Sequence, residues 1–119
     1  MKYIRTGSEI YDTDDLYVCE ELADKPYATK NGYWCIYKES IIKEADTIEE
    51  LCDEFVILFN GTKSNDQSVL KNYQNVKTYF RRNKRYRLNH IKEIYGAIWT
   101  DKGLIYVAKM NDKGELELL

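Results

Sequence analysis

The sequence predicts one α+β domain with an antiparallel sheet, a C-terminal three-stranded meander, one short helix and one longer basic helix. Three observations support this class. Turn signals separate short runs of aromatic and β-branched residues, two amphipathic segments have helical spacing, and no linker rich in Pro, Gly or Ser divides the 119 residues. The composition, 44% hydrophobic and 32% charged with one proline, excludes collagen-like, mucin-like and disordered chains. We therefore expect a single compact domain over residues 1–119.

The first third of the chain is expected to contain four short strands. Residues 2–6 and 9–12 flank Gly7-Ser8, and a glycine suits the first central position of a type II′ hairpin turn. Residues 16–19 and 33–37 are rich in aromatic and β-branched residues, and Asn31-Gly32 is a turn signal just before the second run. Residues 20–30, which include the only proline, are expected to form a surface loop.

The middle of the chain changes its hydrophobic period twice. Ile41 and Ile42 suggest a short strand, and residues 47–50 match the capping box that begins many helices. The short helix is predicted from apolar residues with the spacing of one helical face, namely Ile48, Leu51, Cys52 and Phe55. The apolar run 55–59 is predicted to be a strand buried on both faces.

The longer helix is expected to begin at Ser64, Asn65 or Asp66 and to continue to about Lys84. Its apolar face is predicted to carry Val69, Tyr73, Val76 and Phe80. The opposite side is predicted to carry Lys71, Arg81, Arg82 and Arg85. Residues 86–93 fit either a continuation of this helix or an alternating strand.

The carboxyl end predicts a three-stranded antiparallel meander over residues 94–100, 104–110 and 115–119. The tripeptide Asp-Lys-Gly separates these strands at 101–103 and again at 112–114, which favours three-residue hairpin loops with glycine at positive φ. Leu116 and Leu118 alternate with Glu115 and Glu117. The last strand is therefore expected to be covered on one face.

Two stretches resemble segments of small uncharacterised phage and prophage proteins from Gram-positive bacteria. They are IIKEADTIEELCDEFV at residues 41–56 and GAIWTDKGLIYVAKM at residues 96–110. The resemblance implies an accessory protein of a mobile element. It brings no active-site pattern that can be carried over to this chain.

The cysteines are three in number, widely separated and without a C-x-x-C pair. We expect Cys19, Cys35 and Cys52 to be free thiols that behave as small buried hydrophobes in a reduced compartment. A tetrahedral zinc site would need all three together with the only histidine, His90, so no metal site is expected. No cofactor is expected either.

The formal charge of −2 hides a strong segregation of charge. Residues 1–60 contain six basic and fourteen acidic residues, a charge of −8, whereas residues 61–119 contain twelve basic and six acidic residues, a charge of +6. Eight basic and no acidic residues lie between Lys71 and Lys92, interleaved with aromatic residues. Cations can neutralise phosphates and rings can stack on unpaired bases, so this segment is a candidate nucleic-acid or partner-binding surface. The candidate residues are Lys77, Arg81, Arg82, Lys84, Arg85 and Arg87.

Two other interpretations of the charge distribution stay open. A cationic helix can remain solvated or pair with acidic side chains of its own fold. Conversely, the acidic runs at residues 9–24 and 44–54 could meet a cationic groove on a protein that handles nucleic acid.

No catalytic motif occurs in the chain: there is no nucleophile elbow, no phosphate-binding loop and no HExxH metal helix, and His90 has no visible nucleophile near it. We expect a non-enzymatic phage accessory protein that binds and modulates a host macromolecular target, with an anti-defence inhibitor as one form. DNA or RNA binding by the basic helix and a sponge for a nucleotide signal are the alternatives.

The expected partners are a host protein or nucleoprotein complex, DNA or RNA, and a second copy of the chain. A membrane is not among them, because the longest apolar run has five residues and the amino terminus lacks an apolar export segment. These features predict a location in the bacterial cytoplasm.

Overall fold

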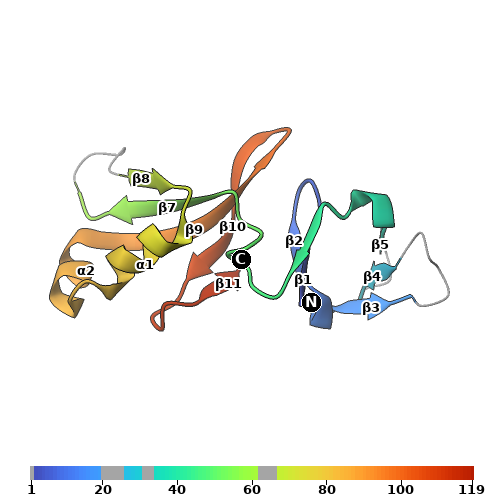
Figure 1. Cartoon of the computed structure of the whole chain (residues 1–119), viewed down its shortest axis with the longest axis horizontal. Helices are drawn as coiled ribbons and strands as arrows, with labels where there is room; N and C mark the ends of the chain where they lie inside the picture. Colours follow the sequence, from blue (N-terminus) through green and yellow to red (C-terminus); the bar gives the residue numbers. More distant parts are fainter. Residues whose placement is uncertain (1, 20–25, 31–33, 62–66) are drawn as a thin grey trace.

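The computed structural model describes residues 2–19, 26–30, 34–61 and 67–119, and it has an α+β fold with two helices and antiparallel sheets (Figure 1). The molecule is elongated, with principal extents of 52 × 28 × 24 Å. A five-stranded sheet and both helices form one end, and the short strands of the first third form the other (Figure 1).

The first third forms two three-stranded sheets. Strand β1 (Tyr3–Arg5) pairs with β2 (Ile10–Asp12) on one side and with β6 (Lys43–Ala45) on the other. Strands β3 (Leu16–Val18), β4 (Tyr27–Thr29) and β5 (Cys35–Ile36) form the second sheet, and 3₁₀ turns η1 (Thr13–Asp15) and η2 (Lys38–Ser40) connect the strands. The first hairpin is thus confirmed.

Several details of this region differ from expectation. Gly7 does not have a positive φ, so the type II′ turn is wrong. The expected loop contains strand β4, and the strand expected at Ile41-Ile42 begins two residues later as β6. Residues 20–25 and the Asn31-Gly32 turn lie outside the described residues.

The short helix predicted from Ile48 to Phe55 is wrong. Residues 46–53 form bends and a turn in which Leu51 N donates to Ile48 O over 3.0 Å. Thr47 does not cap a helix, because its buried Oγ1 has no hydrogen-bond partner. Ile48 and Leu51 are nevertheless buried, so their apolar character serves the core without helical geometry.

The five-stranded sheet has the order β11-β10-β9-β7-β8. Its strands are β7 (Glu54–Phe59), β8 (Gln67–Leu70), β9 (Ile91–Thr100), β10 (Gly103–Met110) and β11 (Leu116–Leu118). The meander is confirmed, with Gly103 at φ 105° and Gly114 at φ 84° in the two Asp-Lys-Gly turns. In β7, Phe55, Val56 and Ile57 are all buried, which confirms the strand covered on both faces.

The prediction of one longer helix is wrong in its extent, and two separate helices occupy part of the predicted range. Residues 67–70 are strand β8 rather than helix, so Val69 is 45% exposed and does not belong to the apolar stripe. Helix α1 spans Tyr73–Arg81, and a separate helix α2 spans Lys84–His90 and leads directly into β9. The proposed caps at residues 64–66 lie outside the described residues.

Three hydrophobic clusters make up the core. The largest packs Val76 of α1 against Phe55, Ile57 and Ile94 of the five-stranded sheet. A second joins Ile10 of the first hairpin to Leu51 and to Ile98 and Val107 of the sheet, and a third is built on Ile4, Leu16 and Ile36. The second cluster therefore links the two ends of the molecule.

A partly buried ion pair reinforces this link. Arg5 of β1 donates from Nη1 and Nη2 to the two carboxylate oxygens of Asp53, both over 2.7 Å, and Nη1 also donates to Leu51 O over 3.0 Å. Trp99 N of β9 donates to the same carboxylate over 2.8 Å. Arg5 and Asp53 thus tie β1 to the turn before β7 and to β9.

The cysteines behave differently from one another. Cys52 packs against two core clusters, and burial raises the pKa of its thiol to about 12. The expectation of a buried thiol is wrong for Cys35, which is exposed in β5. Cys19 is half-buried, and all three are free.

Candidate nucleic-acid interface

Helices α1 and α2 form an elbow at one end of the molecule. Each helix has an asparagine N-cap: Asn72 Oδ1 accepts from Gln74 N, and Asn83 Oδ1 accepts from Tyr86 N, both over 2.8 Å. Arg82 has extended backbone angles, φ −56° and ψ 151°, which stop α1 before α2 begins. The basic residues are therefore divided between two short helices, and the chain changes direction between them (Figure 1).

The apolar side of α1 holds the elbow on the sheet. Val76 is fully buried, the Tyr73 ring lies 5.1 Å from that of Phe55, and the Tyr79 ring lies edge-on to Phe59 at 6.0 Å. The predicted stripe of Tyr73, Val76 and Phe80 is thus brought to the core cluster, without Val69. This packing fixes the orientation of the basic side chains.

Four candidate cations of the elbow are exposed. They are Arg81 at the end of α1, Arg82 directly after it, and Lys84 and Arg85 in the first turn of α2. Within the described residues, ion pairs join Lys2 to Asp12, Arg5 to Asp53 and Lys109 to Glu93, and none includes a candidate site residue. The alternative that the basic helix is neutralised by the fold's own carboxylates is therefore not observed in this part of the chain.

Three candidate cations, Arg82 among them, lie on aromatic rings of the same elbow. Lys77 Nζ is 5.1 Å from the centre of the Tyr73 ring. The guanidinium of Arg82 lies between two rings, 4.9 Å from Tyr79 and 4.6 Å from Tyr86. These contacts stabilise the elbow, because Arg82 joins a ring from each helix.

Arg87 of α2 also lies over an aromatic ring, that of Phe80 in α1. Its guanidinium carbon lies 4.2 Å from the centre of the Phe80 ring, and its Nη1 donates to Phe80 O over 2.8 Å. Arg87 thereby satisfies a carbonyl at the end of α1 from within α2. In the candidate set, Arg81, Lys84 and Arg85 are exposed, Lys77 and Arg87 are half-buried on rings, and Arg82 is both exposed and placed on two rings.

This division changes what the surface can recognise. Tyr73, Tyr79, Phe80 and Tyr86 each have a cation of the elbow over the ring, and Tyr86 also lies 4.5 Å from the His90 ring. These ring faces are occupied, so the arrangement favours contacts with phosphates over stacking on several unpaired bases. His90 is exposed, and its ring packs on Tyr86.

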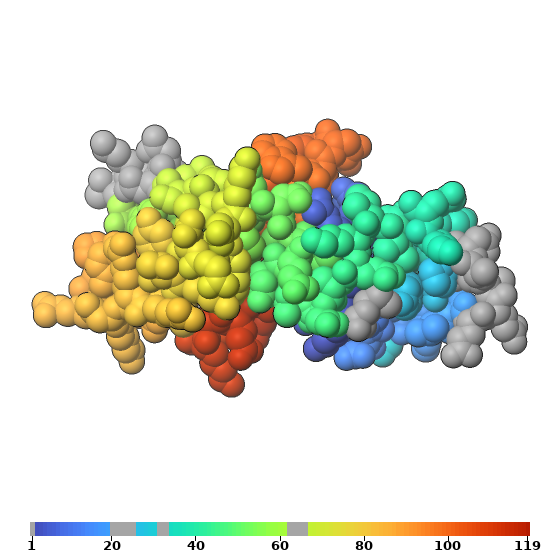
Figure 2. Space-filling model, viewed as in Figure 1, coloured from blue at the N-terminus to red at the C-terminus, as the bar shows by residue number. Residues whose placement is uncertain are grey.

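The surface over α1 and α2 occupies one end of the long axis, in yellow and orange in Figure 2, and the acidic first third occupies the other, in blue and cyan. Exposed acidic residues of that end include Glu9, Asp14, Asp15 and Glu44. Glu20, Glu21 and Asp24 lie outside the described residues.

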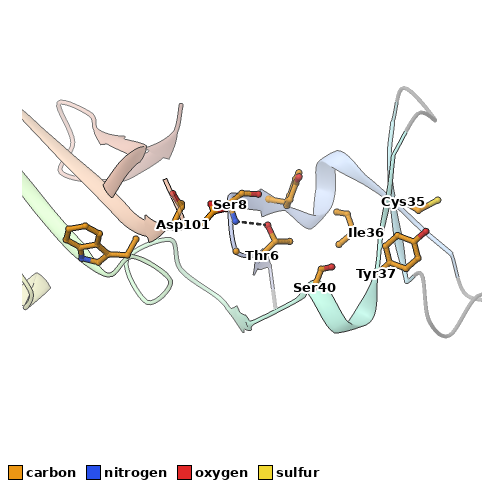
Figure 3. Close-up of a pocket in the computed structure, with 11 residues that line it drawn as sticks. Thr6, Ser8, Cys35, Ile36, Tyr37, Ser40 and Asp101 are labelled. Atoms are coloured by element: carbon orange, nitrogen blue, oxygen red, sulfur yellow. Dashed lines mark hydrogen bonds between the residues drawn. The ribbon is translucent and has the colours of Figure 1, made fainter. Parts of the chain in front are cut away.

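A hollow lies near the middle of the molecule (Figure 3). The open cleft has a volume of about 580 Å³ and runs from the Trp99–Asp101 turn past Thr6 and Ser8 to Tyr37. Ser8 N donates to Thr6 Oγ1 over 3.4 Å, and Asp101 lies beside them. No Lys, Arg or His is among the described residues that line it, so these residues offer no cationic side chain to an anion.

Comparisons with known proteins give no relative: no family model matches the chain, and no curated protein or solved structure is significantly similar to it. In the part of the chain that the structure describes, no His, Cys, Asp or Glu residues gather in a group that could hold a metal ion. Neither described helix is long and apolar enough to span a bilayer.

Proposed function

We propose that this chain is a non-enzymatic nucleic-acid-binding protein that contacts the phosphate backbone through the α1–α2 elbow. One observation carries the proposal: Arg81, Lys84 and Arg85 are exposed together, and no described carboxylate pairs with them. Such a partner implies a location in the cytoplasm.

The physical argument is electrostatic. Each cation that neutralises a phosphate releases a condensed counterion, so exposed Arg and Lys side chains gain affinity from the polyanion without reading its sequence. Because Arg82 and Arg87 already hold the rings of the elbow, the exposed cations are carried on a preorganised surface and little ordering is required on binding. We therefore expect binding with weak sequence preference and strong salt dependence.

Replacing Arg81, Lys84 and Arg85 together by alanine tests this function. We expect the plot of log affinity for a duplex against log salt concentration to lose about two to three units of slope, because up to three phosphate contacts disappear. Fluorescence anisotropy between 50 mM and 200 mM salt measures the slope, and circular dichroism checks the fold.

The matched control replaces three exposed lysines outside the elbow, Lys30, Lys38 and Lys102, and changes the net charge by the same amount. We expect this control to retain the native slope. Absence of binding by the native chain at low salt, or an equal loss in the control, would contradict the proposal.

The segregated charge also supports a second candidate. We propose that the phage resemblance and the exposed acidic end fit an accessory protein that binds and modulates a host nucleoprotein complex, in the manner of an anti-defence inhibitor. Affinity capture from host extract with the native chain and with a variant carrying Asp14→Lys, Asp15→Lys and Glu44→Lys tests it. The native chain should retain a specific target and reduce its activity, and the variant should do neither. If the native chain reduces the activity of none of the host proteins that it retains, this candidate is ruled out.

A further inference from the structure

A cleft of about 430 Å³ lies beside the cationic elbow, between α2 and strands β9 and β10. Its floor is apolar and consists of Ile91, Ile94 and Met110, all buried. Leu88 also lines it and is 63% exposed, so its side chain is accessible to a ligand at the edge of the cleft. The volume falls in the range of roughly 300–1,000 Å³ that is typical of small-ligand sites.

The cleft combines this floor with an oriented cation. Both Arg87 and Phe80 line it, and the guanidinium of Arg87 is held over the Phe80 ring by the hydrogen bond to Phe80 O. Guanidinium planes stack on nucleobases, and a guanidinium that is already fixed loses little freedom when a base arrives. The site therefore provides apolar contact and one planar cation for a flat aromatic ligand.

The remaining polar groups fit the rest of a nucleotide. Lys84 and Lys92 are exposed and line the cleft, so they can neutralise a phosphate attached to the ligand. Asp112 brings a carboxylate that can accept hydrogen bonds from an exocyclic amino group. Glu93 also lines the cleft, and its carboxylate is paired with Lys109 over 3.6 Å.

The cleft is continuous with the proposed interface because Lys84 belongs to both. We propose that this cleft binds a single unpaired nucleotide, with the base between the apolar floor and Arg87 and the phosphate at Lys84 and Lys92. The inference rests on the proposed function, and it makes the nucleotide the unpaired end of a strand whose duplex lies on the elbow. A free mononucleotide has the same chemistry, and the experiment separates the two sources.

The test compares a blunt DNA duplex with the same duplex carrying a three-nucleotide overhang, by fluorescence anisotropy at one salt concentration. We expect the native chain to bind the overhang form about tenfold more tightly, the effect of roughly one well-stacked base. Leu88→Ser should reduce this advantage to about twofold and leave blunt-duplex affinity unchanged, since Leu88 carries no charge. Ile42→Ser, which removes an equally exposed apolar side chain far from the cleft, should keep the full advantage.

Arg87→Lys provides a second variant, because it keeps the positive charge and removes the planar guanidinium group. It should lower the ratio of the two affinities, and thermal melting checks that the elbow remains folded. Adenosine monophosphate should compete away the overhang advantage and reduce blunt-duplex affinity by no more than the loss of the one phosphate contact at Lys84, which the two sites share.

Equal affinity of the native chain for both duplexes would overturn the inference while the proposed function stands. Adenosine monophosphate that binds without any overhang advantage would also overturn it, and would assign the cleft to free nucleotide. Failure to bind either duplex would instead contradict the proposed function.

Discussion

Asp53→Ala is expected to lower the free energy of unfolding by about 3 kcal/mol, near the lower limit for breaking a buried ion pair. The variant leaves Arg5, whose side chain is 12% exposed, without its carboxylate, and it removes the acceptor for Trp99 N. Arg5 Nε already has no hydrogen-bond partner, so the guanidinium has little alternative compensation. Urea denaturation followed by fluorescence of the two tryptophans measures the change.

The exposed ion pair between Lys2 and Asp12, 3.9 Å apart, supplies the control. Lys2→Ala should lower the free energy of unfolding far less than Asp53→Ala, because solvent screens this pair. A loss below about 1 kcal/mol for Asp53→Ala would show that Arg5 finds water or another acceptor, and that the ion pair does not tie β1 to β9.

The same ion pair sets a dependence on pH. The hydrogen bonds from Arg5 lower the pKa of Asp53, the Trp99 N–H acts in the same direction, and burial opposes both. Because the pKa is lower in the folded than in the unfolded state, the stabilisation is complete above the ordinary aspartate pKa and is lost as pH falls through the folded value. The stability difference between the native chain and Asp53→Ala should therefore be constant near neutrality and shrink below about pH 4.

Gly114→Ala is expected to destabilise the fold by about 3 kcal/mol. Gly114 has φ 84°, and a Cβ placed there would lie 2.6 Å from Cε1 and 2.9 Å from Cδ1 of Phe80. Alanine therefore adds backbone strain to a clash with a ring that is packed against the core. Thermal and urea unfolding measure the loss.

Gly103→Ala is the matched control, since Gly103 occupies the corresponding position of the first Asp-Lys-Gly turn at φ 105° and has nothing within 4 Å of a Cβ. It should lower the free energy of unfolding by about 1 kcal/mol, because it adds backbone strain without a side-chain clash. Equal losses in the two variants would show that the Phe80 ring moves away without penalty. A larger loss at Gly114 would show that the turn and α1 are tightly packed.

The features predictable from sequence are those fixed by local chemistry. The two Asp-Lys-Gly turns define the meander because only glycine adopts positive φ without strain, and residues 55–59 identify a buried strand by uniform apolar character. The alternation of Leu116 and Leu118 with glutamates gives the covered face of β11, as the burial pattern confirms.

The failures lie where tertiary pairing overrides a local pattern. Phe55 completes a helical spacing with Ile48 and Leu51, yet it pairs with Leu70 and Gly96 as part of β7. A helix of eight residues gains too little to compete with these ladder hydrogen bonds. Residues 67–70 likewise pair with the edge of β7. The hydrophobic period of a single sequence does not reveal this pairing.

The candidate site was partly predictable. The run of eight cations without an acid locates the elbow, and Asn83, a strong N-cap residue, is the signal that could have divided the helix. Sequence does not show which cations lie on rings, because Arg82 meets Tyr79 and Tyr86 only after the chain turns between the helices. The cleft residues Ile91 and Met110 were missed because they belong to separate strands.

The exposed cations of α1 and α2 lie at one end of the 52 Å axis, so the positive charge of this chain is unevenly distributed along its length. The field of a polyanion exerts a torque on such a molecule and rotates it before contact, so that α1 and α2 arrive first.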